Sequence, residues 1–155
     1  MLITSHLAVT ILAGQALSLS TSEFFTALAG GVALDLDHLL VNGKWLSDAR
    51  VFLRRGITTH GEVNQHSWIQ EPLFGSIFGI IAGVAIHYWN PEVRWWIFPA
   101  FQGSHIMMDA FMKYDHHPFT PILSKISYRG LIRPNSKIEW LVSFLVLAAV
   151  VLWLL

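Results

Sequence analysis

Three ionisable side chains, Asp35, Asp37 and His38, stand near the end of an apolar run that covers residues 24–41. A charged group in an apolar setting is tolerated when it is paired, hydrated or bound to a metal. The chain contains no cysteine, so its metal ligands can only be its eight histidines and its carboxylates. Imidazole together with carboxylate suits zinc, manganese or iron. The cluster therefore predicts a divalent metal site.

The spacing of these residues supports this interpretation. His105 and Asp109 are four residues apart and Asp35 and His38 are three apart, so each pair lies on one face of a helix. Asp37 points roughly 160° away from Asp35 if that helix is regular. We expect Asp37 to bind a second ion, to support the ligands of the first, or to lie where the helix breaks. The prediction is one or two ions, with zinc or manganese preferred.

The elements that must position these residues are apolar helices. The chain of 155 residues is 54% hydrophobic and only 13% charged, which is outside the range of ordinary soluble domains. Apolar runs long enough for helices that span a membrane cover residues 2–19, 24–41, 68–89, 95–112 and 139–155. The sequence thus predicts an all-α, polytopic membrane protein of about five transmembrane helices, with residues 1–155 forming a single domain.

The positions of the basic residues predict the orientation. With five spans, nine of the ten Lys and Arg residues lie on the side of the N-terminus, and only Arg94 lies opposite. By the positive-inside rule, we expect a multi-pass protein of the inner membrane with a cytoplasmic N-terminus. The balanced charge and the lack of a basic, aromatic-rich motif argue against nucleic acid as a partner. Membrane lipids are the expected partners.

Most of the histidines and several aspartates then fall at one level. Eight of them lie at the cytoplasmic ends of four spans: His6, Asp35, Asp37, His38, His60, His66, His105 and Asp109. Unrelated polar residues would not be expected to share one level, so we expect a single polar site that opens to the cytoplasm. In contrast, His87 lies on the opposite side among aromatic residues, and His116 and His117 are expected to be solvated.

Several short motifs resemble those of the YdjM-like inner-membrane proteins, which are classed as metal-dependent hydrolases. These motifs are the early His6, Asp35-Leu36-Asp37-His38, Arg55-Gly56-Ile57-Thr58-Thr59-His60, His66-Ser67 and His105-x-x-x-Asp109, within residues 6 to 122. The family's compact His-Arg-Gly-x-Thr-His-Ser run is split here. Either His60 or His66 can therefore hold its ligand role, and we favour His66 because it directly precedes a span.

These observations predict a hydrolase of an ester or phosphoester carried by a lipid or amphiphile at the cytoplasmic leaflet. We expect metal ligation by His6, Asp35, Asp37, His66, His105 and Asp109. Asp37, as base, and His38 or His60, as proton shuttle, are the expected catalytic residues. Arg54 and Arg55 are expected to bind a substrate phosphate, although anchoring to anionic headgroups explains them equally well.

Other functions fit the same residues. A metal-ion or proton transporter also places His and Asp inside a membrane, but a transport path needs polar groups toward both faces. A regulatory membrane protein with a structural metal is a further alternative. Without any metal, Asp35 and Asp37 would pair with basic residues at the surface, and His105 with Asp109 would be a buried hydrogen-bonded pair.

Overall fold

The computed structural model describes residues 3–36, 68–113, 115–119, 122–123, 125–132 and 137–154. Within these residues the chain is predominantly helical, which confirms the predicted class. The elements are α1 (Ile3–Ala16), α2 (Thr21–Gly31), η1 (Ala33–Leu36), η2 (Trp68–Gln70), α5 (Pro72–Trp89), α6 (Ile97–Ala110), β1 (Asp115–His116), β2 (Tyr128–Arg129) and α7 (Lys137–Leu154).

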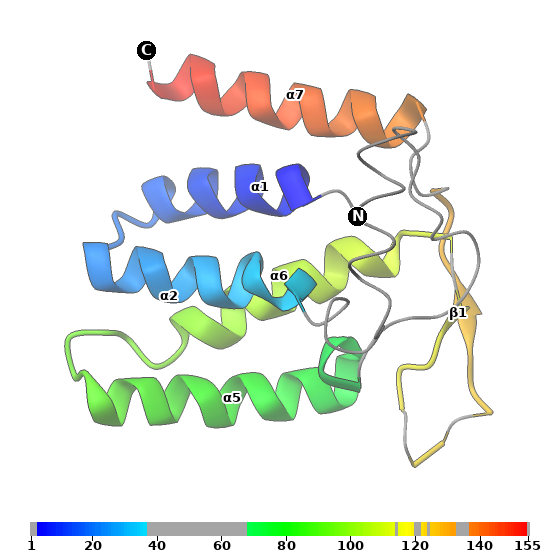
Figure 1. The fold of residues 1–155 in the computed structure, drawn as a ribbon, viewed down its shortest axis with the longest axis horizontal. Helices are drawn as coiled ribbons and strands as arrows, with labels where there is room; N and C mark the ends of the chain where they lie inside the picture. Colours follow the sequence, from blue (N-terminus) through cyan, green and yellow to red (C-terminus); the bar gives the residue numbers. More distant parts are fainter. Residues whose placement is uncertain are drawn as a thin grey trace.

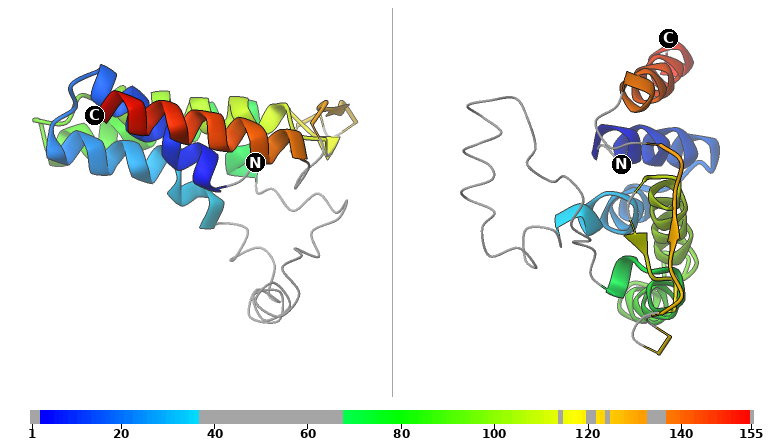
Figure 2. Two further views of the ribbon diagram at one scale, coloured as in Figure 1. Left: turned by 90° about the horizontal axis from the view of Figure 1, so that it is seen from above. Right: turned by 90° about the vertical axis from the view of Figure 1, so that its right-hand side faces the viewer.

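The five α-helices run along the long axis of the molecule (Figure 1). Helix α6 packs against both α2 and α5, while α1 packs against α2 and α7. One end of the bundle gathers the starts of α1, α5 and α7 together with the ends of α2 and α6 (Figures 1 and 2). The core lies between α2 and α6, where Ala27, Ile97 and Phe101 are buried.

Helix α2 begins with a capping box. The Ser20 hydroxyl accepts a hydrogen bond from the Glu23 backbone N–H, and the Glu23 carboxylate accepts one from the Ser20 backbone N–H. Glu23 also accepts hydrogen bonds from Arg94 Nε at 2.5 Å and Arg94 Nη2 at 3.0 Å. This buried carboxylate therefore joins the start of α2 to the segment before α6.

The sequence predicts one continuous helix over the second apolar run, up to residue 41, but the structure does not have this continuous helix. Helix α2 ends at Gly31, where the Val32 N–H closes the last turn on the Leu28 carbonyl, and the short η1 follows. The pair Gly30-Gly31 explains this end, because glycine is among the weakest helix formers. Both glycines are buried, and a Cβ at Gly30 would meet the Phe98 carbonyl oxygen at 2.7 Å. Close approach to α6 thus coincides with the end of the helix.

Helix α5 approaches α6 along a stripe of buried glycines at Gly75, Gly79 and Gly83. A Cβ at Gly79 would lie 2.3 Å from Gln102 Oε1, and one at Gly83 would lie 2.2 Å from the Trp95 carbonyl oxygen. Only hydrogen atoms fit in these spaces, so the glycines let the backbones of the two helices come close together.

A small sheet follows α6, in the region between the predicted spans 95–112 and 139–155. Strands β1 and β2 are antiparallel, with Asp115 opposite Arg129 and His116 opposite Tyr128. The Phe111 carbonyl, at the end of α6, accepts hydrogen bonds from the N–H groups of Leu131 and Ile132. The described residues from Asp115 to Ile132 are called the β1–β2 hairpin below. These bonds fasten the hairpin to the end of α6.

The prediction of five spanning helices finds limited support. Among the described residues, one helix, Pro72–Trp89, is long and apolar enough to cross a membrane, and the apolar part of α7, Trp140–Leu152, is shorter. Helices α1, α2 and α6 have 14, 11 and 14 residues, which corresponds to roughly 16 to 21 Å. A hydrocarbon core is about 30 Å thick, so these three helices alone do not reach across it.

Candidate metal centre

Three buried side chains from two helices converge at the end of the bundle that carries the β1–β2 hairpin. His6 is in the first half of α1, and His105 and Asp109 are one turn apart near the end of α6. Each offers one ligand atom, and these atoms lie within 4.8 Å of one another. The three residues are between 0% and 4% exposed. The chain thus brings together three of its predicted ligands in a group that could hold a metal ion.

The end of α2 orients His105. The Nδ1 of His105 lies 3.0 Å from the Gly31 carbonyl oxygen. A carbonyl only accepts, so Nδ1 carries the proton, and in the neutral ring the lone pair is on Nε2. Metal-binding histidines are commonly held by this kind of bond from the other ring nitrogen. Because α2 ends at Gly31, its carbonyl is available for this contact.

That orientation places two acceptors opposite each other. His105 Nε2 is 3.5 Å from Asp109 Oδ2, and in the neutral ring it presents a lone pair toward a carboxylate. Such a contact is favourable only when a positive charge joins the two atoms, either a proton on the imidazole or a bound cation. The His105–Asp109 pair could therefore hold either a proton or a metal cation.

His6 completes the group. Its Nε2 lies 3.2 Å from Asp109 Oδ1, and its ring stacks on that of His105 with a centroid separation of 3.9 Å. The other ring nitrogen, Nδ1, is buried and has no hydrogen-bond partner among the described residues. A buried nitrogen without a partner is costly. The described protein groups alone thus leave the Nδ1 of His6 without a hydrogen bond.

The residues present fit a divalent cation. Two ligands that each lie about 2.05 Å from a tetrahedral zinc ion are about 3.3 Å apart. The contacts of Asp109 Oδ1 with His6, at 3.2 Å, and of Asp109 Oδ2 with His105, at 3.5 Å, are close to that separation, each through a different carboxylate oxygen. The donor set of two imidazoles and one carboxylate suits zinc or manganese.

The sequence interpretation missed two buried polar residues in the elements next to the group. Gln102 is 1% exposed and donates from Nε2 to the Ile69 carbonyl, and its position three residues before His105 places it on the same face of α6. Glu71, immediately before Pro72 at the start of α5, is 4% exposed, and both carboxylate oxygens contact the His117 N–H at 3.1 Å. A carboxylate directly before a helix-starting proline was the signal for Glu71.

His116, predicted to be solvated, is instead buried. Its ring stacks on Tyr128 with a centroid separation of 4.7 Å, and its Nε2 lies 3.2 Å from the Met112 carbonyl. Burial lowers the pKa of His116 below the usual 6.5. In the same hairpin, the hydrogen bond from Arg129 lowers the pKa of Asp115. The β1–β2 hairpin is therefore a structured element beside the site.

The other predicted site residues are not placed. The backbone of Asp35 lies in η1, next to the end of α2. Outside the described residues are the predicted metal ligands Asp37 and His66, the catalytic residues His38 and His60, and the substrate-binding residues Arg54 and Arg55. Their roles stay predictions.

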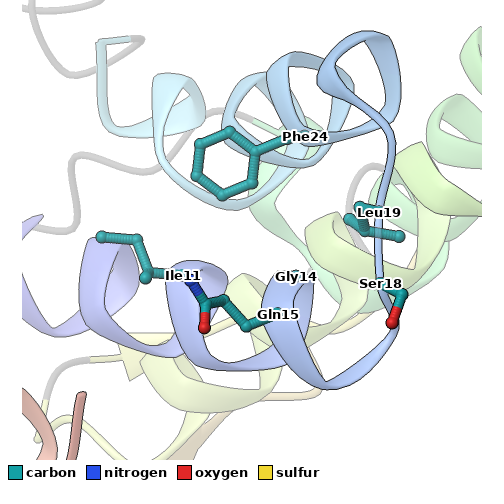
Figure 3. Close-up of a pocket in the computed structure, with 6 residues that line it drawn as sticks. All are labelled: Ile11, Gly14, Gln15, Ser18, Leu19 and Phe24. Atoms are coloured by element: carbon teal, nitrogen blue, oxygen red, sulfur yellow. The ribbon is translucent and has the colours of Figure 1, made fainter. Parts of the chain in front are cut away.

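A separate cavity of about 370 Å³ lies between α1 and α2 at the opposite end of the bundle (Figure 3). It is lined by Ile11, Gly14, Gln15, Ser18, Leu19 and Phe24. None of these side chains is ionisable, so this cavity offers no acid, base or strong metal ligand. Within the described parts of the chain, the buried histidine–aspartate group offers the metal ligands instead.

Comparison with known proteins finds no match among protein-family models, curated proteins or solved structures. The resemblance to the YdjM-like proteins therefore stays a prediction from short motifs.

Proposed function

We propose that this chain is a metal-dependent hydrolase of the inner membrane that acts on an ester or phosphoester of a lipid or another amphiphile at the cytoplasmic leaflet. The observation that supports it most is the buried group of His6, His105 and Asp109, whose ligand atoms face one another. Buried ionisable residues that converge from separate helices are a default indication of a functional site.

In this proposal His6, His105 and Asp109 hold a divalent cation, with zinc or manganese preferred. Such a cation supplies Lewis-acid chemistry, because it activates water near neutral pH and polarises an ester or phosphoester oxygen. The Gly31 carbonyl fixes the ring of His105 through Nδ1. The three ligands among the described residues would leave one tetrahedral coordination position for water or substrate, as catalytic zinc sites require.

Placement in a membrane is supported by the exposed apolar faces of α5 and α7. Helix α5 exposes Ile77, Ile80, Ile81 and Val84, and α7 exposes Ile138, Leu141, Phe144, Leu145, Leu147, Val151 and Leu152. Apolar faces of this extent fit hydrocarbon better than water. The proposed orientation, with several embedded helices and the site on the cytoplasmic side, follows from the nine-to-one distribution of basic residues.

The experiment is a hydrolysis screen with purified protein in mild detergent. Aryl esters, aryl phosphodiesters and short-chain phospholipids are offered to protein that is metal-depleted or reloaded with zinc or manganese. We expect hydrolysis by reloaded protein only. Asp109→Asn should abolish hydrolysis. His87→Gln should retain it, because His87 is in the last turn of α5, away from the metal group at the other end of the bundle. Hydrolysis that is the same in depleted protein and in Asp109→Asn would refute the proposal.

The depth of burial favours one second candidate, a membrane protein whose metal is structural. The three ligands are at most 4% exposed, and closed sites are typical of structural metals. In that case metal removal lowers the unfolding temperature while no substrate in the screen is hydrolysed. The hydrolysis screen and a thermal unfolding measurement on the same samples therefore distinguish the two candidates.

A further inference from the structure

The β1–β2 hairpin exposes several large apolar side chains. Leu131 is 86% exposed, Ile122 is 70% exposed and Leu123 is 50% exposed. Phe119 and Ile126 are also exposed. Exposed apolar side chains spread along a short segment at one end of the bundle suit contact with an apolar partner.

Two exposed lysines lie in or next to the same segment. Lys125 is exposed between Leu123 and Ile126, and Lys113 is exposed just before β1. Neither lysine has an ion-pair partner within the described parts of the chain, whereas Arg129 is paired with Asp115 at 2.6 Å. Apolar side chains interleaved with unpaired lysines are the composition that suits the headgroup layer of an anionic membrane.

The position of the hairpin fits that layer. It lies across the ends of the helices rather than along them, at the end of the bundle that holds His6, His105 and Asp109 (Figures 1 and 2). If α5 crosses the membrane, a segment that lies across its start is parallel to the membrane plane. Two backbone hydrogen bonds also hold the hairpin at this end of the bundle. The Leu73 N–H of α5 donates to the Pro118 carbonyl, and the Lys113 backbone N–H donates to the Ile132 carbonyl.

From these observations we infer that the β1–β2 hairpin lies in the headgroup layer of the anionic leaflet, with Ile122, Leu123 and Leu131 inserted between lipids. Lys113 and Lys125 then contact lipid phosphates. This inference rests on the membrane placement in the proposed function. It names anionic lipid as the partner of the site. The hairpin would hold the lipid surface beside the metal ligands, so that an amphiphilic substrate in that surface reaches them.

The lack of cysteine makes a direct test possible. Single variants Ile122→Cys, Ile81→Cys and Glu92→Cys carry an environment-sensitive fluorophore at the hairpin, in the middle of α5 and in the exposed turn after α5, respectively. Each protein is reconstituted in nanodiscs of phosphatidylcholine with or without phosphatidylglycerol. Quenching is measured with headgroup-level nitroxide lipids and with aqueous iodide. All three positions are exposed, so labelling is expected to leave the fold intact.

With phosphatidylglycerol present, we expect the Ile122→Cys label to be quenched by the nitroxide lipids, protected from iodide and shifted to the blue. The Glu92→Cys label should be quenched by iodide. Each lysine near an anionic surface contributes about fivefold to binding. Lys113→Ala combined with Lys125→Ala should therefore lower the ratio of inserted to free hairpin by more than about tenfold.

Three outcomes overturn the inference. One is an Ile122→Cys label as open to iodide as the Glu92→Cys label, while the Ile81→Cys label is in lipid; this leaves the proposed function intact. Another is a label shielded from both quenchers, which indicates a protein partner instead. The third is an Ile81→Cys label in water, which removes the membrane placement itself. Metal content measured on the same samples shows separately whether the ligand group is retained.

Discussion

The close approach of α5 and α6 at Gly83 predicts that Gly83→Ala destabilises the protein. A Cβ at this position would lie 2.2 Å from the Trp95 carbonyl oxygen and 2.7 Å from Pro99 Cδ. Neither atom is the end of a flexible side chain, so the helices must separate by roughly 1 Å, and overpacking of this kind costs about 1 to 3 kcal/mol.

Gly103→Ala is the matched control, because a Cβ at Gly103 of α6 meets nothing within 4 Å. Alanine improves helix propensity by about 0.5 to 1 kcal/mol at either position. The difference between the two variants therefore isolates the steric effect, and we expect it to be about 1 to 3 kcal/mol.

Thermal unfolding in detergent, followed by circular dichroism, measures the difference. For a chain of this length, the midpoint of Gly83→Ala should lie about 3 to 10 °C below that of Gly103→Ala. Gly83 is at the opposite end of α5 from the metal group, so metal content should be equal in both. Equal midpoints would show that the two helices do not approach closely at Gly83 and would refute the packing described for α5 and α6.

Three further predictions follow. Ile97→Ala should lower the free energy of unfolding by about 2 to 4 kcal/mol, because Ile97 is fully buried, whereas Ile80→Ala on the exposed face of α5 should cost less than about 1 kcal/mol, as chemical denaturation will show. Arg94→Ala should lower the unfolding temperature more than Glu92→Ala does, because it leaves the buried Glu23 carboxylate without its ion pair; equal effects would contradict this. His116 should titrate by NMR with a pKa below 6.5. Its neutral form is favoured by the fold, so its contribution to stability is present above pH 6.5 and decreases as the pH falls below that value; a pKa of 6.5 or higher would contradict this.

The helical class and the grouping of three of the predicted ligands were accessible from the sequence. Apolar runs predicted the regions of all five α-helices, and the spacing of His105 and Asp109 placed both on one helix face, where the structure brings them to His6. These features depend on periodicity and composition, which are properties of short stretches of chain.

The end of α2 was not predicted, because the apolar run continues past Gly31 to residue 41. What ends the helix is the glycine pair together with contacts from α6, including the bond of His105 to the Gly31 carbonyl. Contacts between distant segments have no local sequence signal. The burial of His116 has the same cause, since it depends on stacking against Tyr128 of β2.

We propose that His6, His105 and Asp109 bind a divalent metal rather than a shared proton. The decisive measurement is elemental analysis of the purified chain after incubation with zinc or manganese and removal of the free ion, run beside His105→Ala and His87→Ala. We expect one or two equivalents of metal in the wild type and in His87→Ala and a marked loss in His105→Ala. No bound metal in the wild type, or equal amounts in all three proteins, would contradict it and identify the group as a proton-linked network.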